Sequence, residues 1–345
     1  MVKSPTLRGT RQNTGVPLKL GSKLGTTQAQ PGHLPDTCSR VMTKDLPHST
    51  AIIILNYNSA AETIRLYASL QPHLRPAVFV LVVDNNSDSS DRAQLTEAIP
   101  SESLIRNDAN LGYAGGNNIG ITLALRRGAE YIWLLNPDIE TGFDVLEALV
   151  HALHTHSRFA AIMPRIVFRD DPSRIYSDGG TMSPTQGFVV GHANTRANIS
   201  EALSNPGDDL KEASFANGSC LLLRARALRE LGNFRECFFL YWEETEWCLR
   251  ARDAGWKVGS LTSVSVAHQS SVKGPRYHFY MSRNRIWLAK LRREYVTKTT
   301  WAVSLQVLLT AMRVPRRPRR LHAWLARLVG SAQGLLAGIF GHCRE

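Results

Sequence analysis

The segment that most constrains the fold is Tyr131 to Glu140, with the sequence Y-I-W-L-L-N-P-D-I-E. Its first five residues are apolar without a break, and so short a run predicts a strand buried on both faces of a sheet. Pro137 cannot donate a ladder hydrogen bond, so the strand ends there and Asp138 follows at its carboxyl end. Ligands bind at this edge of open α/β sheets, where a carboxylate suits a divalent cation that carries a diphosphate. The alternative for this segment alone is a turn aspartate that satisfies its own backbone.

Further apolar runs ahead of this segment predict two buried strands and one short strand, at 51–55, 77–83 and 104–105. The intervening stretches predict helices at 60–70, 89–99 and 119–127. An alternation of strands and helices favours a parallel sheet with right-handed crossovers. With 345 residues, 43% of them hydrophobic and 20% charged, the chain is long enough for one large domain or two small ones.

Polar side chains follow the predicted strands at the edge where a nucleotide would bind. Tyr57 is placed to stack on a base or ribose, and Asp84 to accept a hydrogen bond from the N–H of a uracil or thymine ring. A glycine-rich loop at Gly115 and Gly116 is expected to let the backbone approach a phosphate. This loop is neither a G-x-G-x-x-G motif after the first strand nor a Walker loop, which argues against NAD(P) and ATP. The predicted nucleotide contacts are Asn56, Tyr57, Asp84, Asn86, Gly115, Gly116, Asn117 and Asn136.

Three carboxylates, Glu243, Glu244 and Glu246, stand at the start of a predicted helix in the second half of the chain. Helix N-termini favour negative charge, so complementation of the helix dipole is one explanation. Aromatic residues surround the same stretch, and carboxylates beside aromatic walls lose water, which raises their pKa toward the range of a general base. These aromatic residues are Phe238, Phe239, Tyr241, Trp242 and Trp247.

His268 follows the next predicted strand, which begins at 256–258. A lone histidine is either a partner for a backbone group or a ligand, and its spacing does not decide between them. The basic, aromatic helix predicted at 277–293 is expected to present Arg283 and Asn284 to the site. Together with Trp242, these two residues form the predicted acceptor-binding set.

The flanks of the chain are basic. Residues 1–48 hold seven Lys/Arg against two Asp/Glu, lack any apolar period, and are expected to be disordered without a secretory signal. Residues 273–345 hold fifteen Lys/Arg against two Asp/Glu. We expect one or two amphipathic helices there, lying on an anionic membrane surface, with packing on the catalytic domain as the alternative. No segment is expected to span a membrane. The five scattered cysteines suit reduced thiols in a cytosolic protein.

Taken together, these segments resemble the family 2 glycosyltransferases with the GT-A fold, in particular the bacterial rhamnosyltransferase-like members, over about residues 50–295. The resemblance implies a Rossmann-like, mainly parallel central sheet flanked by helices, followed by C-terminal amphipathic helices. It also implies a nucleotide-binding half at 49–140 and an acceptor half at 141–295, with a helical tail at 296–345. The motifs that carry it are I-I-L-N-Y-N, V-V-D-N-N-S-D, N-L-G-Y-A-G-G-N-N, L-L-N-P-D, F-A-N-G-S-C, W-E-E-T-E-W-C-L-R and H-Q-S-S.

The resemblance assigns roles to the acidic residues. The family's D-x-D metal motif falls on Asn136-Pro137-Asp138, so only Asp138 remains as the main ligand of a divalent cation, Mg²⁺ or Mn²⁺. His268 matches a histidine that in related enzymes touches the metal or the diphosphate. The family's E-D-x-D falls on residues 243–246 and makes Glu244 the expected base, where the family mostly has Asp. Glu243 or Glu246 is expected to share this work.

The implied activity is inverting transfer of a sugar, with rhamnose as the candidate, from a dTDP- or UDP-sugar to a hydroxyl of a glycan or lipid-linked acceptor. The implied setting is bacterial cell-envelope polysaccharide synthesis, in the cytoplasm or at the inner face of the plasma membrane. Three alternatives remain open at this point. A nucleotidyltransferase needs a basic, glycine-rich loop after the first strand, which residues 56–58 lack. A nucleic-acid-binding protein would use the basic tail but not the acidic cluster. A transferase without the first Asp of D-x-D would only bind its donor.

Overall fold

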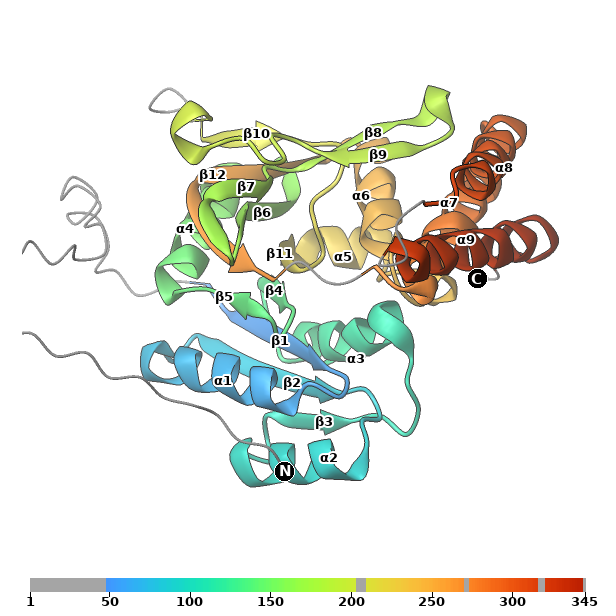
Figure 1. Ribbon diagram of the computed structural model, residues 1–345. Coiled ribbons are helices and arrows are strands. Elements are labelled where there is room, and N and C mark those ends of the chain that lie inside the picture. The colour runs from blue at the N-terminus through green and yellow to red at the C-terminus, as the bar shows by residue number, and fades with distance from the viewer. Residues whose placement is uncertain (1–47, 203–208, 270–272, 316–319, 344–345) are drawn as a thin grey trace, which may run out of the picture. The chain divides into compact units, whose positions relative to one another are not determined.

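A computed structural model describes residues 48–202, 209–269, 273–315 and 320–343. The expected disorder of residues 1–48 therefore falls, except for His48, outside the described residues. Within these ranges the strands form a ten-stranded sheet in the order β10-β12-β6-β11-β4-β1-β2-β3, with β5 beside β12 and β7 beside β6, and a separate β8–β9 hairpin (Figure 1). The strand bounds are β1 Thr50–Asn56, β2 Val78–Asp84, β3 Leu104–Arg106, β4 Tyr131–Leu135, β5 Ile139–Glu140, β6 Phe159–Phe168, β7 Asp171–Ser177, β8 Gly180–Ser183, β9 Val189–His192, β10 Leu210–Glu212, β11 Cys220–Arg224 and β12 Lys257–His268.

The N-terminal half of the sheet is parallel. Strand β1 pairs in parallel with β2 and with β4, and β2 pairs in parallel with β3. Every residue of β4 is buried, as the unbroken apolar run predicted. In the other half, β11 runs antiparallel to both β4 and β6, while β12 runs parallel to β6. The predicted strands of the first half are therefore confirmed, and the antiparallel insertion of β11 is the feature that the sequence pattern did not show.

Helices pack on the sheet and then continue as a C-terminal bundle (Figure 1). Helices α1 and α3 contact β1, α4 contacts β6 and β12, α5 contacts β11, and α6 contacts β12. The bounds are α1 Ala60–Leu70, α2 Ser89–Ala98, α3 Gly112–Arg126, α4 Phe143–Thr155, α5 Ala225–Leu231, α6 Glu243–Asp253, α7 Pro275–Arg292, α8 Val296–Met312 and α9 Leu321–Phe340, with short 3-10 helices η2 Gln71–His73, η3 Pro184–Gln186, η4 Ile199–Glu201 and η5 Glu236–Phe238.

The glycine-rich segment is helical, so the prediction of a phosphate-binding loop at Gly115 and Gly116 is wrong. Helix α3 begins at Gly112, and both glycines lie buried in its first turns. A Cβ atom on Gly116 would lie 2.5 Å from a methyl group of Leu55. The missing side chains therefore let α3 approach the sheet closely, which is a packing role of glycine. Asn117 is buried in the same helix and donates its amide to the carbonyl of Tyr113.

Helix α9 packs along α7 through three glycines spaced four residues apart, Gly330, Gly334 and Gly338. A Cβ atom on Gly334 would meet the carbonyl of Phe279 and lie 2.9 Å from Cβ of Ser282. Small residues at this spacing let two helix backbones approach closely. One face of α9 is therefore buried against α7 within the same chain.

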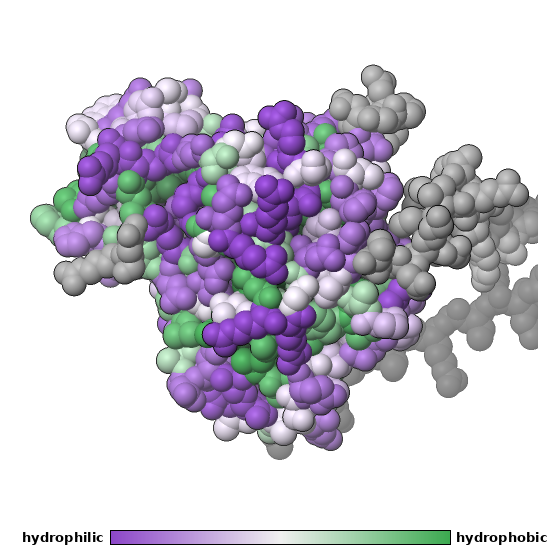
Figure 2. Space-filling model, turned by 180° about the vertical axis from the view of Figure 1, so that it is seen from behind, coloured by the Kyte–Doolittle hydropathy of each residue, from purple (hydrophilic) through white to green (hydrophobic). Residues whose placement is uncertain are grey.

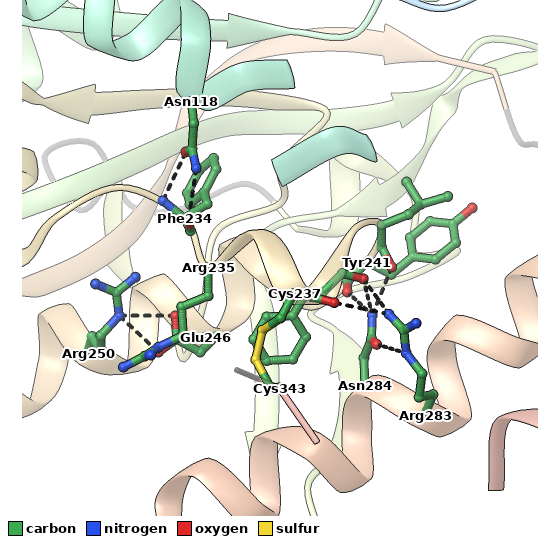
Figure 3. The surroundings of a disulfide bond; sticks show 12 residues. Asn118, Phe234, Arg235, Cys237, Tyr241, Glu246, Arg250, Arg283, Asn284 and Cys343 are labelled. Carbon is green, nitrogen blue, oxygen red and sulfur yellow. Dashed lines mark hydrogen bonds and ion pairs between the residues drawn. A yellow bond between two sulfur atoms is a disulfide. The ribbon is translucent and has the colours of Figure 1, made fainter. Parts of the chain in front are cut away.

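Two features of the tail differ from the sequence expectation. A disulfide joins Cys237 to Cys343 across 106 residues, so the expectation of reduced thiols is wrong for this pair, while Cys220 and Cys248 are free and buried (Figure 3). Helix α9 is also long and apolar enough to cross a membrane by length and composition alone. Hydrophobic and strongly hydrophilic side chains lie side by side at the edge of the molecule that carries these helices (Figure 2).

Replacing Gly334 by valine should lower the free energy of unfolding by about 1–3 kcal/mol, because the added side chain overlaps the α7 backbone. Urea unfolding followed by circular dichroism measures this change. Gln333→Val is the matched control, since Gln333 is exposed on the same helix. Equal urea midpoints for the two variants would show that α9 does not pack on α7 through Gly334.

Candidate functional site

The carboxyl ends of β1 and β2 are tied together by buried polar side chains. Asn56 and Asp84 lie opposite each other in the parallel register, and both are fully buried. The Asn56 amide donates to Oγ of Ser87 at 2.9 Å and to a carboxylate oxygen of Asp91 at 2.7 Å. Asn56 therefore positions this edge of the sheet, and its predicted contact with a nucleotide, like that of the equally buried Asp84, stays a prediction. Tyr57, which follows it, is 45% exposed and free to stack on a ring.

Arg92 orients the loop that carries the predicted base-binding residues. Its Nε lies 3.2 Å from a carboxylate oxygen of Asp84, and its Nη2 donates to the side-chain oxygen of Asn86. Asn86 has a φ of 65°, a left-handed conformation that asparagine tolerates better than most residues. Sequence reasoning missed Arg92, although its spacing eight residues after Asp84 on the following helix could have suggested it.

Asp138 lies beside His268 because strand β5 pairs with strand β12. Strand β5 pairs antiparallel with β12, with Ile139 opposite His268, and the preceding Asp138 carboxylate then lies 3.4 Å from Nε2 of His268. Arg169 supports the same segment by donating to the carbonyl of Asp138 at 2.8 Å. The Asp138 side chain is 35% exposed, whereas that of His268 is mostly buried. The structure therefore brings the two predicted metal ligands together at one point of the sheet edge.

The chemistry of this pair fits a divalent cation. Burial lowers the pKa of the His268 imidazole, while the charge of Asp138 opposes the shift and that of Arg169 adds to it. A neutral imidazole keeps the lone pair that a metal needs. No group of three or more His, Cys, Asp or Glu side chains that could hold a metal occurs among the described residues. Two protein ligands suit Mg²⁺ or Mn²⁺ because such ions take their remaining ligands from substrate phosphates and water.

The segment before α6 has an unusual backbone. Phe239, Tyr241 and Trp242 all have φ values between 65° and 77°, a conformation that is strained for bulky residues. Asn284 of α7 holds this segment by donating its amide to the carbonyls of Phe238, Leu240 and Tyr241, at 2.7–2.9 Å (Figure 3).

The predicted acceptor-binding set is largely structural. Asn284 is fully buried and its amide is engaged by backbone, so the prediction of an acceptor contact is wrong for this residue. Arg283 donates to the carbonyls of Cys237 and Phe238 and stacks 4.1 Å from the ring centroid of Trp287. Trp242 is buried in a hydrophobic cluster, although its side chain also lines a groove beside Tyr277. These contacts position the start of α6.

Glu246 is held by two arginines and does not act as a base. Its carboxylate lies 3.1 Å from Nε of Arg235 and 2.8 Å from Nε of Arg250, and its side chain is 6% exposed (Figure 3). Both oxygens of this carboxylate accept hydrogen bonds from arginine, so the two arginines already engage the atoms that would have to take a proton from an acceptor hydroxyl. The prediction that Glu246 shares the catalytic work is therefore corrected.

Glu243 and Glu244 form a buried, interacting pair. Burial and the neighbouring charge of Glu244 hold the pKa of Glu243 well above its ordinary range, and its Oε2 has no hydrogen-bond partner in the described part of the chain. Burial also raises the pKa of Glu244, whereas hydrogen bonds from backbone N–H groups and from Thr245 oppose the shift. Glu243 is thus the member that keeps its proton longer, and Glu244 is the less buried of the two, as the predicted base would be.

A two-residue segment connects the metal-ligand pair to the glutamate pair. The backbone N–H of Asn136 donates to the carbonyl of Ser219 at 2.9 Å. Cγ of Glu244 also lies 3.4 Å from where a Cβ on Gly218 would be. The Asn136-Pro137-Asp138 segment and Glu244 therefore both lie next to the Gly218–Ser219 segment. The structure brings these predicted residues to one place.

Two tyrosines that sequence reasoning missed lie between the same groups. Burial raises the pKa of the Tyr176 phenol, and the nearby Tyr277 and Asp138 raise it further. The pKa of Tyr241 rises to about 12, first through burial and then through Tyr277, Glu243, Tyr176 and Glu244. These interactions show that Asp138, the two tyrosines and the two glutamates are neighbours. Tyr241 stands in the aromatic motif before Glu243, whereas nothing in the sequence around Tyr176 points to the site.

Residues 51–232 match the family model described as Glycosyl transferase family 2. The low-salt glycan biosynthesis hexosyltransferase Agl10 of Haloferax volcanii is 31% identical over 243 residues, which cover 68% of this chain and 73% of that protein. The N-acetylglucosaminyl-diphospho-decaprenol L-rhamnosyltransferase of Mycobacterium tuberculosis is 28% identical over 247 residues, which cover 67% of this chain and 78% of that protein.

Two solved structures share the fold at low sequence identity. The mannosyltransferase PcManGT from Pyrobaculum calidifontis in complex with GDP-Man and Mn²⁺ has a TM-score of 0.52 and 13% identity, covering 86% of this chain and 89% of that chain. GalNAc-T7 with UDP, GalNAc and Mn²⁺ has a TM-score of 0.57 and 12% identity, covering 84% of this chain and 54% of that longer chain. The predicted GT-A fold is confirmed.

Glu246→Gln should lower the free energy of unfolding by about 3 kcal/mol, because it removes the buried negative charge that pairs with Arg235 and Arg250. Glu244→Gln should be at least as stable as the wild type near neutral pH. When folding raises the pKa of a carboxyl group, the free energy of unfolding of the protein falls as pH rises through that pKa. Glutamine does not ionise, so Glu244→Gln avoids this fall. Urea unfolding at two pH values measures both effects, and the reverse ranking of the variants would contradict these roles.

Proposed function

Because the chain belongs to glycosyl transferase family 2, we propose that it is an inverting enzyme that moves a sugar from a nucleoside diphosphate sugar to a hydroxyl of a glycan or lipid-linked acceptor. The observation that supports this most directly is the Gly218–Ser219 segment, which the Asp138 segment and Glu244 both approach. A donor diphosphate beside Asp138 would place its sugar next to the proton acceptor. Family membership speaks against the nucleotidyltransferase and the nucleic-acid-binding alternatives.

The donor would bind along the edge formed by β1, β2 and β4. Tyr57 stacks on the base or ribose, and Asp84, held by Arg92, accepts from the ring N–H of uracil or thymine. Asp138 and His268 would hold the divalent cation, which supplies positive charge against the departing nucleoside diphosphate. The presence of Mn²⁺ in both structural neighbours supports a divalent cation.

The acceptor reacts on the opposite side of the sugar. Glu244 accepts the proton of the acceptor hydroxyl while that oxygen forms a bond to the anomeric carbon. The bond between the anomeric carbon and the diphosphate oxygen breaks in the same displacement, and the electron pair leaves with the nucleoside diphosphate. One displacement inverts the configuration without a covalent intermediate. Burial of Glu244 raises the pKa of its carboxyl group and thereby its basicity.

The relatives narrow the substrates. Their names include a hexosyltransferase of glycan biosynthesis and a rhamnosyltransferase that acts on a diphospho-decaprenol acceptor. We therefore propose a dTDP- or UDP-sugar donor, rhamnose as the first sugar to test, and an acceptor of the cell-envelope glycan. A lipid-linked acceptor would hold the enzyme at the inner face of the plasma membrane, with its basic tail against anionic lipid.

Nucleotide binding should depend on a cation held by Asp138. A thermal-shift screen of UDP, dTDP and GDP sugars with and without Mn²⁺ should find one donor that stabilises the protein only with the metal, by roughly 2.7 kcal/mol at 100 times its Kd. Asp138→Asn should abolish this shift. Glu97→Gln is the control, since Glu97 is exposed on α2. A full metal-dependent shift in Asp138→Asn would exclude Asp138 as a ligand.

Transfer should depend on Glu244 as a base. Glu244→Gln should lower kcat by about 10²–10⁴-fold with little change in the KM of the donor. The wild-type rate should fall as pH drops through a pKa above the ordinary carboxyl range, since the base acts only when ionised. Initial rates of nucleoside diphosphate release across pH measure both effects. Glu230→Gln, exposed on α5, is the control, and an undiminished rate in Glu244→Gln would rule this role out.

A further inference from the structure

A groove with a volume of about 660 Å³ lies between α8 and α9, beside the N-terminal end of α7. Its apolar lining includes Leu305, Leu309 and Trp324, and the indole N–H of Trp324 donates to the carbonyl of Thr310 at 2.6 Å. Four cationic side chains line the same groove, and no carboxylate does: Lys273, Arg313, Arg320 and Arg327. An apolar wall beside concentrated positive charge suits an anion that carries a hydrocarbon chain.

The cations of this groove are available to a ligand. All four side chains belong to exposed residues, and none forms an ion pair with a carboxylate within the described ranges. Burial lowers the pKa of the neighbouring His278, and the charges of Arg327 and Lys273 lower it further, which places these two cations close to one ring. Closely spaced like charges repel each other, so a bound anion of more than one charge would relieve this repulsion.

A second groove of about 340 Å³ continues from the first toward the start of α6. It shares Lys273, His278, Gln306 and Arg327 with the first groove and extends to Trp242 and Tyr277. The ring centroid of Tyr277 lies 5.2 Å from that of Tyr241, whose phenol interacts with the charges of Glu243 and Glu244. The two grooves therefore lead from the cations of the tail to Trp242, the residue that directly precedes Glu243 and Glu244.

We propose that these two grooves bind a sugar acceptor linked through a diphosphate to a polyisoprenoid lipid. The diphosphate lies on Lys273, Arg320 and Arg327, the isoprenoid chain lies along Leu305, Leu309 and Trp324, and the sugar points past Tyr277 toward Glu244. This assignment rests on the proposed function, because it takes Glu244 as the group that receives the acceptor proton.

The surroundings favour a lipid diphosphate over the headgroups of a bilayer. Apolar side chains on the outer surface of α8 and α9 are exposed beside the groove, as Leu308, Met312, Leu325 and Val329 show. These residues suit contact with the membrane from which a lipid chain would enter. A headgroup site would need the cations alone, whereas here the cations open into a second groove that leads to Trp242.

Binding of geranylgeranyl diphosphate to the full-length protein tests the groove without any transfer reaction. Displacement of a fluorescent analogue should show tight binding of geranylgeranyl diphosphate and much weaker binding of geranylgeraniol or inorganic diphosphate. The double variant Arg320→Gln/Arg327→Gln should bind geranylgeranyl diphosphate about 10- to 100-fold more weakly, as expected for the loss of charge-assisted hydrogen bonds. Arg276→Gln/Arg293→Gln is the matched control, because these exposed arginines line neither groove.

The proposal would be overturned if the two double variants bound geranylgeranyl diphosphate with equal affinity, or if the wild type bound inorganic diphosphate as tightly as geranylgeranyl diphosphate. It would also be overturned if Arg320→Gln/Arg327→Gln lost binding to phosphatidylglycerol vesicles but kept its affinity for geranylgeranyl diphosphate. The last result would assign the cations to bilayer headgroups. Failure of the proposed function would appear differently, as a wild type that transfers no sugar from any donor, and the binding result would still decide whether the groove takes a lipid diphosphate.

Discussion

The antiparallel pairing of β11 with β4 is the constraint on which the site depends. Cys220 lies opposite Leu135 in this register, so the chain that leads into β11 passes directly beside the chain that leaves β4. That crossing fixes Ser219 against Asn136 through one backbone hydrogen bond. Together with the pairing of β5 with β12, it joins the nucleotide-binding half of the sheet to the half that carries Glu244. The parallel strands alone place Asp84 and Asp138 at one rim, but they supply no proton acceptor.

The second constraint is the strained segment from Phe239 to Trp242. Three bulky residues with positive φ are costly, and they persist because the surrounding structure determines them. Asn284 on α7 holds the segment in this conformation through its hydrogen bonds to the backbone. Helix α9 in turn packs on α7 through Gly330, Gly334 and Gly338. Helix α9 ends near the disulfide between Cys237 and Cys343, which lies just before the strained segment. The C-terminal helices are thus part of the support of the candidate site.

Sequence reasoning located what depends on local pattern. The unbroken apolar run at 131–135 gave a buried strand, and the carboxylates at strand ends followed from the direction of parallel strands. It failed where tertiary partners decide. Gly115 and Gly116 suggested a loop because glycine weakens helices, yet close packing against Leu55 requires them within α3. Asn284 was predicted to contact the acceptor because its sequence surroundings do not show its actual partners. These are three backbone carbonyls that lie more than forty residues away in the sequence.

The three glutamates show the same limit. Glu246 could have been set aside from the sequence, because Arg250 stands four residues later on the same helix, a spacing typical of an ion pair. Its second partner, Arg235, and the contact of Glu244 with Gly218 depend on how loops meet in space. Tyr176 joins the site through the pairing of β7 with β6, a register that no motif announces.

A crystal structure of the protein with Mn²⁺ and its nucleoside diphosphate would show whether Asp138, His268 and Glu244 serve one reaction centre. Anomalous scattering would locate the metal, and we expect a single strong peak between the Asp138 carboxylate, Nε2 of His268 and the diphosphate. The Glu244 carboxylate should face the vacant space where the donor sugar would lie. A metal and diphosphate bound elsewhere, or a Glu244 carboxylate on the far side of Gly218–Ser219 from the diphosphate, would contradict a single reaction centre.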